Sequence, residues 1–366
     1  MHIRKAFEMA AAARQFAAGT NEDEALNAIV SKAVGNVSFY FDAVFGDLEK
    51  ICSKEKVIVL TDENIYGLHQ QRFTGYRVIK IPAGEQNKNQ RTVDNIIAEL
   101  IKLEAGKDSF LVGVGGGVVT DITGYVAAVY MRGVSFGLVP TSILCMVDAV
   151  IGGKNGIDVG VYKNMVGTIR QPDFIFYDYS FLKTLPVEEW VNGFAEIIKH
   201  ACIKDAVMFA MLERYSLHDF QADETLIADL VEKNVVIKTS IVACDECEKG
   251  ERKLLNFGHT VGHAIENLHQ LPHGHAISIG MAAACNLSEQ FAGLHFDEAK
   301  KVILLLSRYH LPVDLETEYE KVFEVLKMDK KRSGDSVNFI LINKIGNGII
   351  YPIALNELHQ HLKQIL

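Results

Sequence analysis

Three groups in the second half of the sequence contain histidine or glutamate, and the first two of them have the i,i+4 spacing of a helix face. The groups are Glu196 with His200, His259 with His263, and His273 with His275. Positions i and i+4 lie on one face of a helix, and imidazole with carboxylate is a donor set that suits Zn²⁺ or a similar ion. A catalytic zinc site uses three protein ligands and keeps one position open. The spacing therefore predicts a metal site but leaves open which three side chains form it.

A glycine-rich turn in the first half follows a predicted strand and opens a predicted helix. It reads Gly113-Val-Gly-Gly-Gly-Val-Val-Thr-Asp121. Its backbone N–H groups can face a phosphate at the helix N-terminus, although a tight turn that needs small residues for packing is the alternative. The usual dinucleotide fingerprint is excluded because Val118 stands where its third glycine would be. Asp121 is expected to interact with the helix dipole or to contact a cofactor hydroxyl.

Charged residues follow this turn in an otherwise apolar stretch. Asp148 lies inside the run that begins at Pro140, and a charge there is costly unless it is paired. We therefore predict a specific partner for Asp148. Lys154 and Lys163 add cations to neighbouring glycine-rich turns, where a lysine in isolation is more often simply solvated. Together with the glycine turn, these residues predict a cleft that binds phosphate.

Basic residues also accompany the histidine groups of the second half. They are Lys199, Lys238, Arg252, Lys330 and Lys331. The chain as a whole is acidic, since 37 Lys and Arg against 46 Asp and Glu give a formal charge of −9. This net charge argues against nucleic acid as a partner. Local clustering of cations in an acidic chain instead predicts a small anionic substrate with phosphate or carboxylate groups.

Two different patterns of elements position these residues. From 37 to 180, short apolar runs alternate with amphipathic stretches, which predicts a parallel α/β fold with right-handed crossovers. Strands are expected at 57–60, 76–81, 109–114, 134–139 and 174–177, and a helix at 89–103. Beyond Pro186, helices are expected at 188–215, 223–246, 258–269, 275–292 and 297–309, followed by a strand pair at 337–342 and 349–351. The second domain is therefore expected to be mainly helical.

The predicted organisation has three parts. An Ala-rich helical extension covers 1–35, a Rossmann-like α/β domain with a non-standard glycine motif covers 36–185, and a mainly helical domain covers 186–366. At 366 residues the chain can bury two cores. No apolar run approaches the roughly 20 residues that span a bilayer, and no signal peptide is recognised, so we expect a cytoplasmic protein. The six cysteines are too sparse for a disulfide scaffold and are expected to be reduced.

With these motifs in place, the sequence resembles the 3-dehydroquinate synthase family, the sugar-phosphate cyclases of the shikimate pathway. The resemblance covers about residues 40–352 and is carried by segments 82–88, 115–121, 131–133, 140–142, 148–154, 163–164, 194–199, 245–246, 256–263 and 273–274. It implies a dehydroquinate synthase-like fold, with an NAD-binding α/β domain and a helical domain that binds metal and substrate.

The resemblance also implies a reaction. The family converts 3-deoxy-D-arabino-heptulosonate 7-phosphate to 3-dehydroquinate and phosphate by transient oxidation with NAD, elimination, reduction and intramolecular aldol closure. The enzyme would be a carbon–oxygen lyase that depends on NAD and on Zn²⁺ or Co²⁺. The metal would polarise the oxidised hydroxyl, and cations would neutralise the leaving phosphate and the substrate carboxylate. We expect a homodimer, with a phosphorylated keto-acid sugar as substrate and no nucleic-acid or membrane partner.

Site residues carry over from the family motifs position by position. The implied metal ligands are Glu196, His259 and His273. The implied cofactor contacts are Asp62, Glu85, Lys88, Gly115, Gly116, Gly117, Asp121, Thr141, Ser142, Asp148, Lys154, Lys163, Phe181 and Thr184. The implied substrate and catalytic residues are Arg132, Asp148, Lys154, Asn164, Lys199, Lys238, Arg252, Asn256, His263 and Lys330. On this assignment His263 faces the substrate and His200 takes no part.

The sequence departs from the family pattern at a few positions. His275 replaces the usual glutamate two residues after His273, Thr120 stands where glycine is common, and 1–35 has no clear counterpart.

Three alternatives remain. They are another sugar-phosphate cyclase of the 2-deoxy-scyllo-inosose or valiolone type, a metal-dependent polyol dehydrogenase of the glycerol dehydrogenase type, and a non-catalytic NAD-binding protein. Asn256 and His263 favour the 3-dehydroquinate synthase family over the sister cyclases, and the clustered cations argue against the polyol dehydrogenase and the non-catalytic protein.

Overall fold

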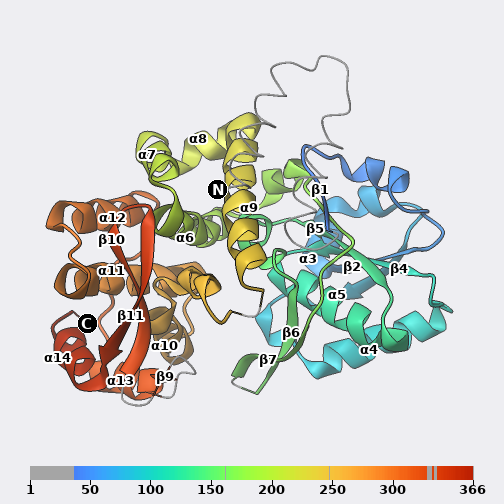
Figure 1. Ribbon diagram of the computed structural model, residues 1–366. Coiled ribbons are helices and arrows are strands. Elements are labelled where there is room, and N and C mark those ends of the chain that lie inside the picture. Colours follow the sequence, from blue (N-terminus) through green and yellow to red (C-terminus); the bar gives the residue numbers. More distant parts are fainter. Residues whose placement is uncertain (1–36, 161, 247, 328–331, 334–335, 366) are drawn as a thin grey trace. The chain divides into compact units, whose positions relative to one another are not determined.

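The chain divides into two compact units (Figure 1). The computed structural model describes residues 37–160, 162–246, 248–327, 332–333 and 336–365. The first unit holds residues 37–185 together with Lys238–Ala243, and the second holds Pro186–Ile237 and the chain from Cys244 onward. The sequence prediction placed 238–243 in the helical domain. The expected extension at 1–35 lies outside the described residues, as does Lys330.

A six-stranded parallel sheet forms the centre of the first unit. In spatial order its strands are β1 (Ser38–Tyr40), β8 (Phe174–Phe176), β5 (Ser135–Pro140), β4 (Phe110–Gly115), β2 (Val57–Asp62) and β3 (Arg77–Ile81). All five pairings between neighbours are parallel. Runs rich in β-branched residues with little polar alternation form such strands because both faces of a parallel sheet are covered. The predicted parallel α/β fold is confirmed.

Different structures cover the two faces of this sheet. Side chains alternate between faces along a strand, and Val112 and Val114 of β4 belong to an aromatic-rich cluster with Phe45 and Phe181. Gly113 points the other way, towards the helix α5 (Gly117–Val129), where an added Cβ would lie 2.4 Å from Thr123 Oγ1. Glycine is therefore required at position 113 for the close approach of α5 to the sheet.

Besides short 3-10 helices, the first unit also contains two further α-helices, a hairpin and a π-helical turn. The helices are α3 (Glu63–His69) and α4 (Gln90–Lys102), the hairpin strands are β6 (Lys154–Val159) and β7 (Tyr162–Ile169), and the π-helical turn covers Cys145–Ala149. Asn89 caps α4 by accepting a hydrogen bond from Thr92 N at 3.1 Å, close to the predicted start. The sequence analysis missed the antiparallel β6–β7 hairpin. Strand β7 is exposed along almost its whole length and lacks the apolar alternation that marks a strand.

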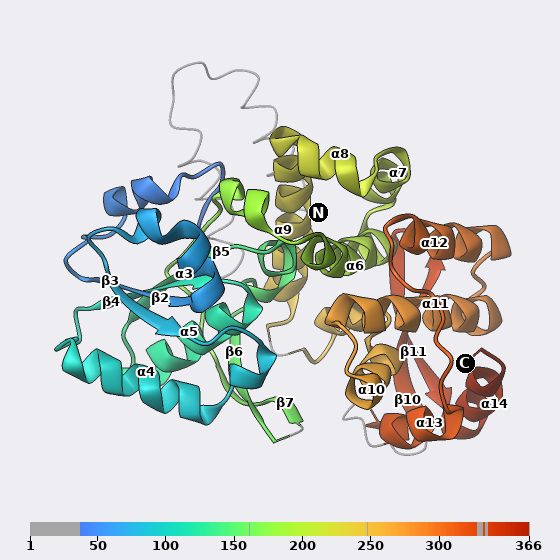
Figure 2. The same cartoon turned by 180° about the vertical axis from the view of Figure 1, so that it is seen from behind.

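Helices dominate the second unit, as predicted (Figure 2). They are α6 (Val187–Lys204), α7 (Ala206–Arg214), α8 (Leu217–Ala222), α9 (Glu224–Cys244), α10 (His259–His269), α11 (His273–Phe291), α12 (Phe296–Arg308), α13 (Tyr319–Lys327) and α14 (Leu355–Ile365). The predicted single helix at 188–215 is wrong. It is two helices, because the Asp205 carboxylate caps α7 by accepting hydrogen bonds from Val207 N and Met208 N.

An antiparallel sheet completes the second unit near the end of the chain. Its order is β11 (Asn347–Ala354), β10 (Ser336–Lys344) and β9 (Arg332–Ser333). The pairing of β10 with β11 confirms the predicted strand pair. Val337, Phe339 and Leu341 of β10 alternate into a core that also contains Val261 of α10 and Ala276 of α11. This core holds α10 and α11 in place.

Glycines allow α10 and α11 to approach each other closely. Gly258 adopts a left-handed conformation with φ of +79° immediately before α10. An added Cβ at Gly280 would lie 1.9 Å from the carbonyl oxygen of Gly258, and one at Gly262 would lie 2.9 Å from that of Ala276. No other residue fits these positions without separating the two helices.

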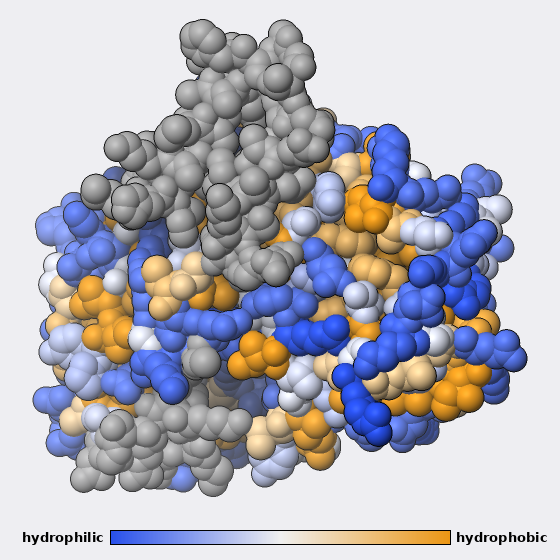
Figure 3. Space-filling view, turned by 45° about the vertical axis from the view of Figure 1, so that its right-hand side comes forward, coloured by the Kyte–Doolittle hydropathy of each residue, from blue (hydrophilic) through white to orange (hydrophobic). Residues whose placement is uncertain are grey.

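The surface mixes hydrophilic and hydrophobic residues (Figure 3). On the face shown, hydrophobic residues lie in separate groups among hydrophilic ones. Among the described residues, no helix combines the length and apolar character needed to cross a lipid bilayer.

The contact at Gly280 gives a stability prediction. Gly280→Ala should lower the free energy of unfolding of the second unit by about 3 kcal/mol, because the added methyl overlaps backbone. The single tryptophan, Trp190, lies buried in α6, so its fluorescence during urea unfolding reports this unit. Gly67→Ala in α3 of the first unit is the control for replacing a helical glycine, since nothing lies within 4 Å of its added Cβ. Circular dichroism follows its unfolding because Trp190 reports only the second unit. Equal shifts of the midpoint from wild type in both variants would contradict the packing argument.

Candidate functional site

The glycine turn lies at the carboxyl edge of the parallel sheet. Gly115 ends β4, Gly116 is the N-cap of α5 and Gly117 is its first residue. Strand β4 lies beside β2, whereas β3, which follows β2 in the chain, lies on the other side of β2. The strand order therefore reverses beside this turn. Open parallel sheets bind ligands outside the carboxyl ends of their strands at such a point.

The glycines of this turn serve two purposes. An added Cβ at Gly115 would lie 2.6 Å from Val119 Cβ, so packing requires glycine there. At Gly116 and Gly117 an added Cβ would meet protein atoms only at 3.6 and 3.7 Å, which is ordinary contact distance. Packing does not require glycine at these two positions. Their lack of a side chain instead leaves the amide groups at the start of α5 open to an anion, which suits the pyrophosphate of a dinucleotide.

Buried Lys88 forms an ion pair with half-buried Asp121 in the first unit. The Lys88 Nζ lies 2.6 Å from Asp121 Oδ2 and also donates to Asn164 Oδ1 at 2.7 Å. Burial opposes the charge of Lys88, but the carboxylates of Asp121 and Glu85 outweigh it and raise the lysine pKa. Burial raises the pKa of Asp121, and Lys88 partly offsets this. Three residues expected at the site are thus in direct contact, while Glu85 lies exposed nearby.

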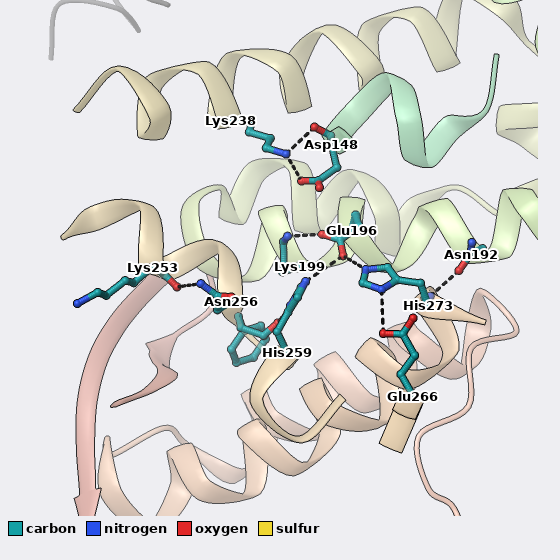
Figure 4. Close-up of polar contacts among 12 residues, drawn as sticks. Asp148, Asn192, Glu196, Lys199, Lys238, Lys253, Asn256, His259, Glu266 and His273 are labelled. Atoms are coloured by element: carbon teal, nitrogen blue, oxygen red, sulfur yellow. Dashed lines mark hydrogen bonds and ion pairs between the residues drawn. The ribbon is translucent and has the colours of Figure 1, made fainter. Parts of the chain in front are cut away.

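Asp148 has the specific partner that the sequence predicted, and the partner is Lys238 (Figure 4). The Lys238 Nζ lies 2.8 Å from Asp148 Oδ1 and also donates to the Asp148 backbone carbonyl. The lysine is buried, and it lies on the part of α9 that belongs to the first unit. This ion pair explains why segment 238–243 departs from the predicted domain boundary.

Other expected cofactor contacts also lie where strands of the sheet end. Asp62 ends β2 and caps α3 by accepting from Ile65 N at 2.9 Å. Thr141 and Ser142 follow β5, and Thr141 N donates to the Gly115 carbonyl at 3.0 Å. The sheet therefore brings Asp62, Thr141 and Ser142 to the same edge as the glycine turn.

Phe181 and Thr184 follow β8 in a short helical segment. Phe181 is buried in the aromatic-rich core cluster that contains Val112 and Val114, so its side chain packs in the core. The Thr184 Oγ1 lies 2.8 Å from His69 Nε2, and the His69 ring packs edge-on against Phe181 at 4.8 Å between centroids. His69 was not identified from the sequence, since a lone histidine carries no pattern.

The remaining cations of the first unit have different surroundings. Lys154 begins β6 and lines the same small recess as Asp121, and Lys163 is exposed on β7. Arg132 follows the C-terminal end of α5, at the amino edge of the sheet where β5 begins. The 13 residues of α5 separate it from the glycine turn by about 20 Å. Within its own unit, Arg132 is therefore not brought to the other expected residues.

The second unit gathers the three expected metal ligands. Glu196 of α6, His259 of α10 and His273 of α11 each offer a ligand atom, and these atoms lie within 4.8 Å of one another. Glu196 Oε1 lies 3.1 Å from His273 Nε2 and 3.5 Å from His259 Nε2, and Lys199 pairs with the other carboxylate oxygen (Figure 4). One carboxylate with two imidazoles is a donor set of a three-ligand zinc site, so the residues present fit a divalent metal.

The charges of this group favour different protonation states for the two histidines. Burial lowers the pKa of His259 well below its usual value, against the opposing effect of Glu196. Burial also acts on His273, but hydrogen bonds to Glu196 and Glu266 outweigh it and raise its pKa to about 9. In the absence of a metal, a proton on His273 thus compensates the buried carboxylates.

The structure distinguishes His273 from its neighbour His275. Gly274 lies so close to α6 that an added Cβ would be 2.2 Å from the Asn192 carbonyl oxygen, and Gly274 N donates to Asn192 Oδ1. This contact holds the start of α11, and with it His273, against the helix that carries Glu196. Among the described residues His275 belongs to no metal-capable group, and burial lowers its pKa.

The other expected residues of the second unit vary in their surroundings. Lys199 is buried against Glu196, and the His263 ring lies 5.1 Å from that of His259 between centroids. Arg252 is buried and donates to the Glu246 carbonyl at 2.6 Å. Asn256, the last of the expected residues here, donates to Glu248 Oε1 at 2.7 Å. His200, for which no role was expected, hydrogen-bonds Asn234 at 2.9 Å.

Sequence reasoning missed Glu266, whose Oε2 lies 3.5 Å from His273 Nδ1. A signal was present, because His259, His263 and Glu266 occupy positions i, i+4 and i+7 of one helix.

Two sugar-phosphate cyclases are among the solved structures that resemble this chain. ValA, a 2-epi-5-epi-valiolone synthase from Streptomyces hygroscopicus subsp. jinggangensis 5008 with NAD⁺ and Zn²⁺ bound, matches 90% of this chain and 96% of its own with a TM-score of 0.82 at 24% identity. A 2-deoxy-scyllo-inosose synthase complexed with carbaglucose-6-phosphate, NAD⁺ and Co²⁺ matches 90% and 97% with a TM-score of 0.80 at 23% identity. At these identities the likeness shows only that this chain has the same fold as these two proteins.

Comparison with known protein sequences identifies the family of this chain more specifically than the fold does. The models of the 3-dehydroquinate synthase N-terminal and C-terminal regions match residues 78–192 and 193–332. A 3-dehydroquinate synthase of Campylobacter concisus (strain 13826) is 38% identical over 314 residues, which is 83% of this chain and 90% of that protein. The chain belongs to the 3-dehydroquinate synthase family.

The geometry predicts which histidine of the His-Gly-His segment holds a metal. His273→Ala should lose stoichiometric zinc, whereas His275→Ala and His275→Glu should retain one zinc per chain, because His273 alone of the two reaches Glu196. Elemental analysis after loading and dialysis measures this. Zinc lost from the His275 variants and kept in His273→Ala would reverse the assignment.

Proposed function

We propose that this chain catalyses the 3-dehydroquinate synthase reaction, in which 3-deoxy-D-arabino-heptulosonate 7-phosphate yields 3-dehydroquinate and phosphate. The observation that carries the proposal is the convergence of Glu196, His259 and His273 in a member of this family. On this proposal the enzyme is a carbon–oxygen lyase that requires NAD and a divalent metal, Zn²⁺ or Co²⁺.

The first unit would hold NAD at the carboxyl edge of its sheet. The open amides of Gly116 and Gly117 fit the pyrophosphate, and Asp62 and Asp121 offer carboxylates to hydroxyl groups. When bound, NAD supplies a redox cycle that ends with the cofactor in its starting state. Thr141, like Asp62, lies at this edge of the sheet, which supports the assignment.

Glu196, His259 and His273 would hold the metal. When bound, it acts as a Lewis acid towards a hydroxyl oxygen of the sugar. Glu196 has no exposed surface and Lys199 pairs with it, so the carboxylate is fixed in place before the metal arrives. A fixed ligand orients the substrate at little further cost in conformational entropy.

The cations of the chain would neutralise the two anionic ends of the substrate. Lys199 and Arg252 of the second unit are buried, which strengthens their attraction for a phosphate or carboxylate. In the first unit, Lys154 lies beside the recess that Asp121 lines. His263 lies next to His259 and is half-buried, so its imidazole is suited to hold or move a proton at the substrate. Lys330, outside the described residues, would add to this group.

A net charge of −9 supports a small molecule rather than nucleic acid as partner. The homodimer and the cytoplasmic location expected from the sequence stay predictions.

The proposed cycle separates a cyclase from a dehydrogenase. With the seven-carbon keto-acid phosphate as substrate, phosphate should appear in a one-to-one ratio with 3-dehydroquinate, should require NAD, and should leave no net NADH. Phosphate assay, NADH absorbance and chromatography of the product measure these quantities. Stoichiometric NADH without phosphate would favour a polyol dehydrogenase, and activity only with other sugar phosphates would favour a sister cyclase.

Lys154 tests the position of the anionic substrate. Lys154→Ala should lower kcat/KM roughly 30- to 900-fold, because a charge-assisted contact is lost. This factor corresponds to about 2 to 4 kcal/mol of lost transition-state stabilisation. Lys80→Ala is the matched control, since Lys80 is an exposed lysine of β3 that lies over the Tyr66 ring. Wild-type kinetics for Lys154→Ala would show that this lysine is only solvated.

A further inference from the structure

His273 lies between two buried carboxylates, one at each of its ring nitrogens (Figure 4). Its Nε2 is 3.1 Å from Glu196 Oε1, and its Nδ1 is 3.5 Å from Glu266 Oε2. Glu266 lies on α10 and is 6% exposed. Glu196 comes from α6, so the imidazole connects carboxylates from two different helices.

The Glu266 carboxylate is important because the two ring nitrogens of His273 would have different roles in metal binding. A neutral imidazole carries one proton, and a metal binds the nitrogen that lacks it. A carboxylate beside Nδ1 holds the proton there and leaves the lone pair on Nε2. Such a partner also fixes the ring orientation and makes the metal-binding nitrogen more basic.

His259 shows the same arrangement with a different acceptor. Its Nδ1 lies 3.1 Å from the Phe257 carbonyl oxygen, and its Nε2 lies 3.5 Å from Glu196 Oε1. Both histidines therefore have an acceptor at Nδ1 and direct Nε2 towards the same carboxylate oxygen. Because a backbone carbonyl serves one histidine and a side chain serves the other, only the second acceptor can be removed by mutation.

We propose that Glu266 is a positioning residue for metal binding. Its carboxylate accepts the Nδ1–H of His273 and so directs Nε2 towards an ion held with Glu196 and His259. The hydrogen bond from Gly274 N to Asn192 Oδ1 fixes the start of α11, and Glu266 fixes the rotation of the ring. This inference rests on the metal site of the proposed function but concerns binding of the metal rather than turnover.

One other role for Glu266 is open to test. His263, Glu266 and His273 also place ligand atoms within 4.8 Å of one another, so Glu266 as a direct ligand would give a second ion that shares His273. A second ion would appear as two metal equivalents in the wild-type chain. A positioning role requires one equivalent.

The experiment titrates Zn²⁺ into the metal-free full chain against a competing chelator, without substrate or NAD. Glu266→Ala should bind one zinc about 10- to 100-fold more weakly than wild type. Glu266→Gln should lose less affinity, because its amide oxygen still accepts the Nδ1–H. The visible spectrum of the Co²⁺-loaded chain should change in Glu266→Ala, since a freed ring alters the ligand geometry.

The matched control is Glu298→Ala. Glu298 is a half-buried carboxylate of the same unit that accepts Ile345 N at 3.1 Å, so its loss tests a purely structural role. This variant should keep wild-type zinc affinity and Co²⁺ spectrum. Thermal unfolding of the metal-free chains shows which variants fold, and if Glu266→Ala does not, the affinity and spectrum of Glu266→Gln decide.

The outcomes separate this inference from the proposed function. Wild-type affinity and spectrum in both Glu266 variants, or two metal equivalents in the wild type that fall to one in Glu266→Ala, would overturn the positioning role. A wild-type chain that binds no zinc would overturn it together with the proposed metal site. A chain that binds one zinc, loses affinity in Glu266→Ala and yet releases no phosphate would support the positioning role and contradict the proposed reaction.

Discussion

The buried carboxylate of Glu196 is the constraint on which the helical unit depends. Glu196 has no exposed surface, and a charge in such a place is strongly destabilising unless other charges or a metal compensate it. Lys199 comes from the same helix, but His259 and His273 come from α10 and α11. Three helices must therefore meet at one point. The small residues between them, above all glycine, allow the approach, and the core under β10 holds the helices there.

In the first unit, ion pairs compensate the charges that lie inside the protein. Lys88 with Asp121 and Lys238 with Asp148 form two pairs in which the lysine is buried and the carboxylate half-buried, and each lysine donates a second hydrogen bond. Pairing keeps these groups charged inside the protein. Because Lys238 comes from α9, the pair it forms also attaches a segment of a later helix to the sheet unit. The open amides of the glycine turn lie in the same unit, so its charged residues are organised before any ligand binds.

This organisation suits a reaction in which the cofactor is restored in every turnover. The protein then has to position groups and stabilise charge, because no net redox equivalent leaves the site. Burying Lys199 and Arg252 reduces the stability of the folded chain, but it places cations where they can stabilise charge at the site. The acceptors at Nδ1 of His259 and His273 fit the same principle, since they fix the orientation of the metal-binding groups in advance.

The sequence alone determined the parallel α/β fold, the helical second half and the types of residue at the site. It did so because apolar periodicity, glycine placement and i,i+4 pairs are local properties of the chain. It also predicted that Asp148 needs a partner, but could not name Lys238, which lies 90 residues away. The place of Glu266 beside His273 was decided by tertiary structure. Contacts between helices depend on how α6, α10 and α11 pack, and no local pattern encodes that geometry.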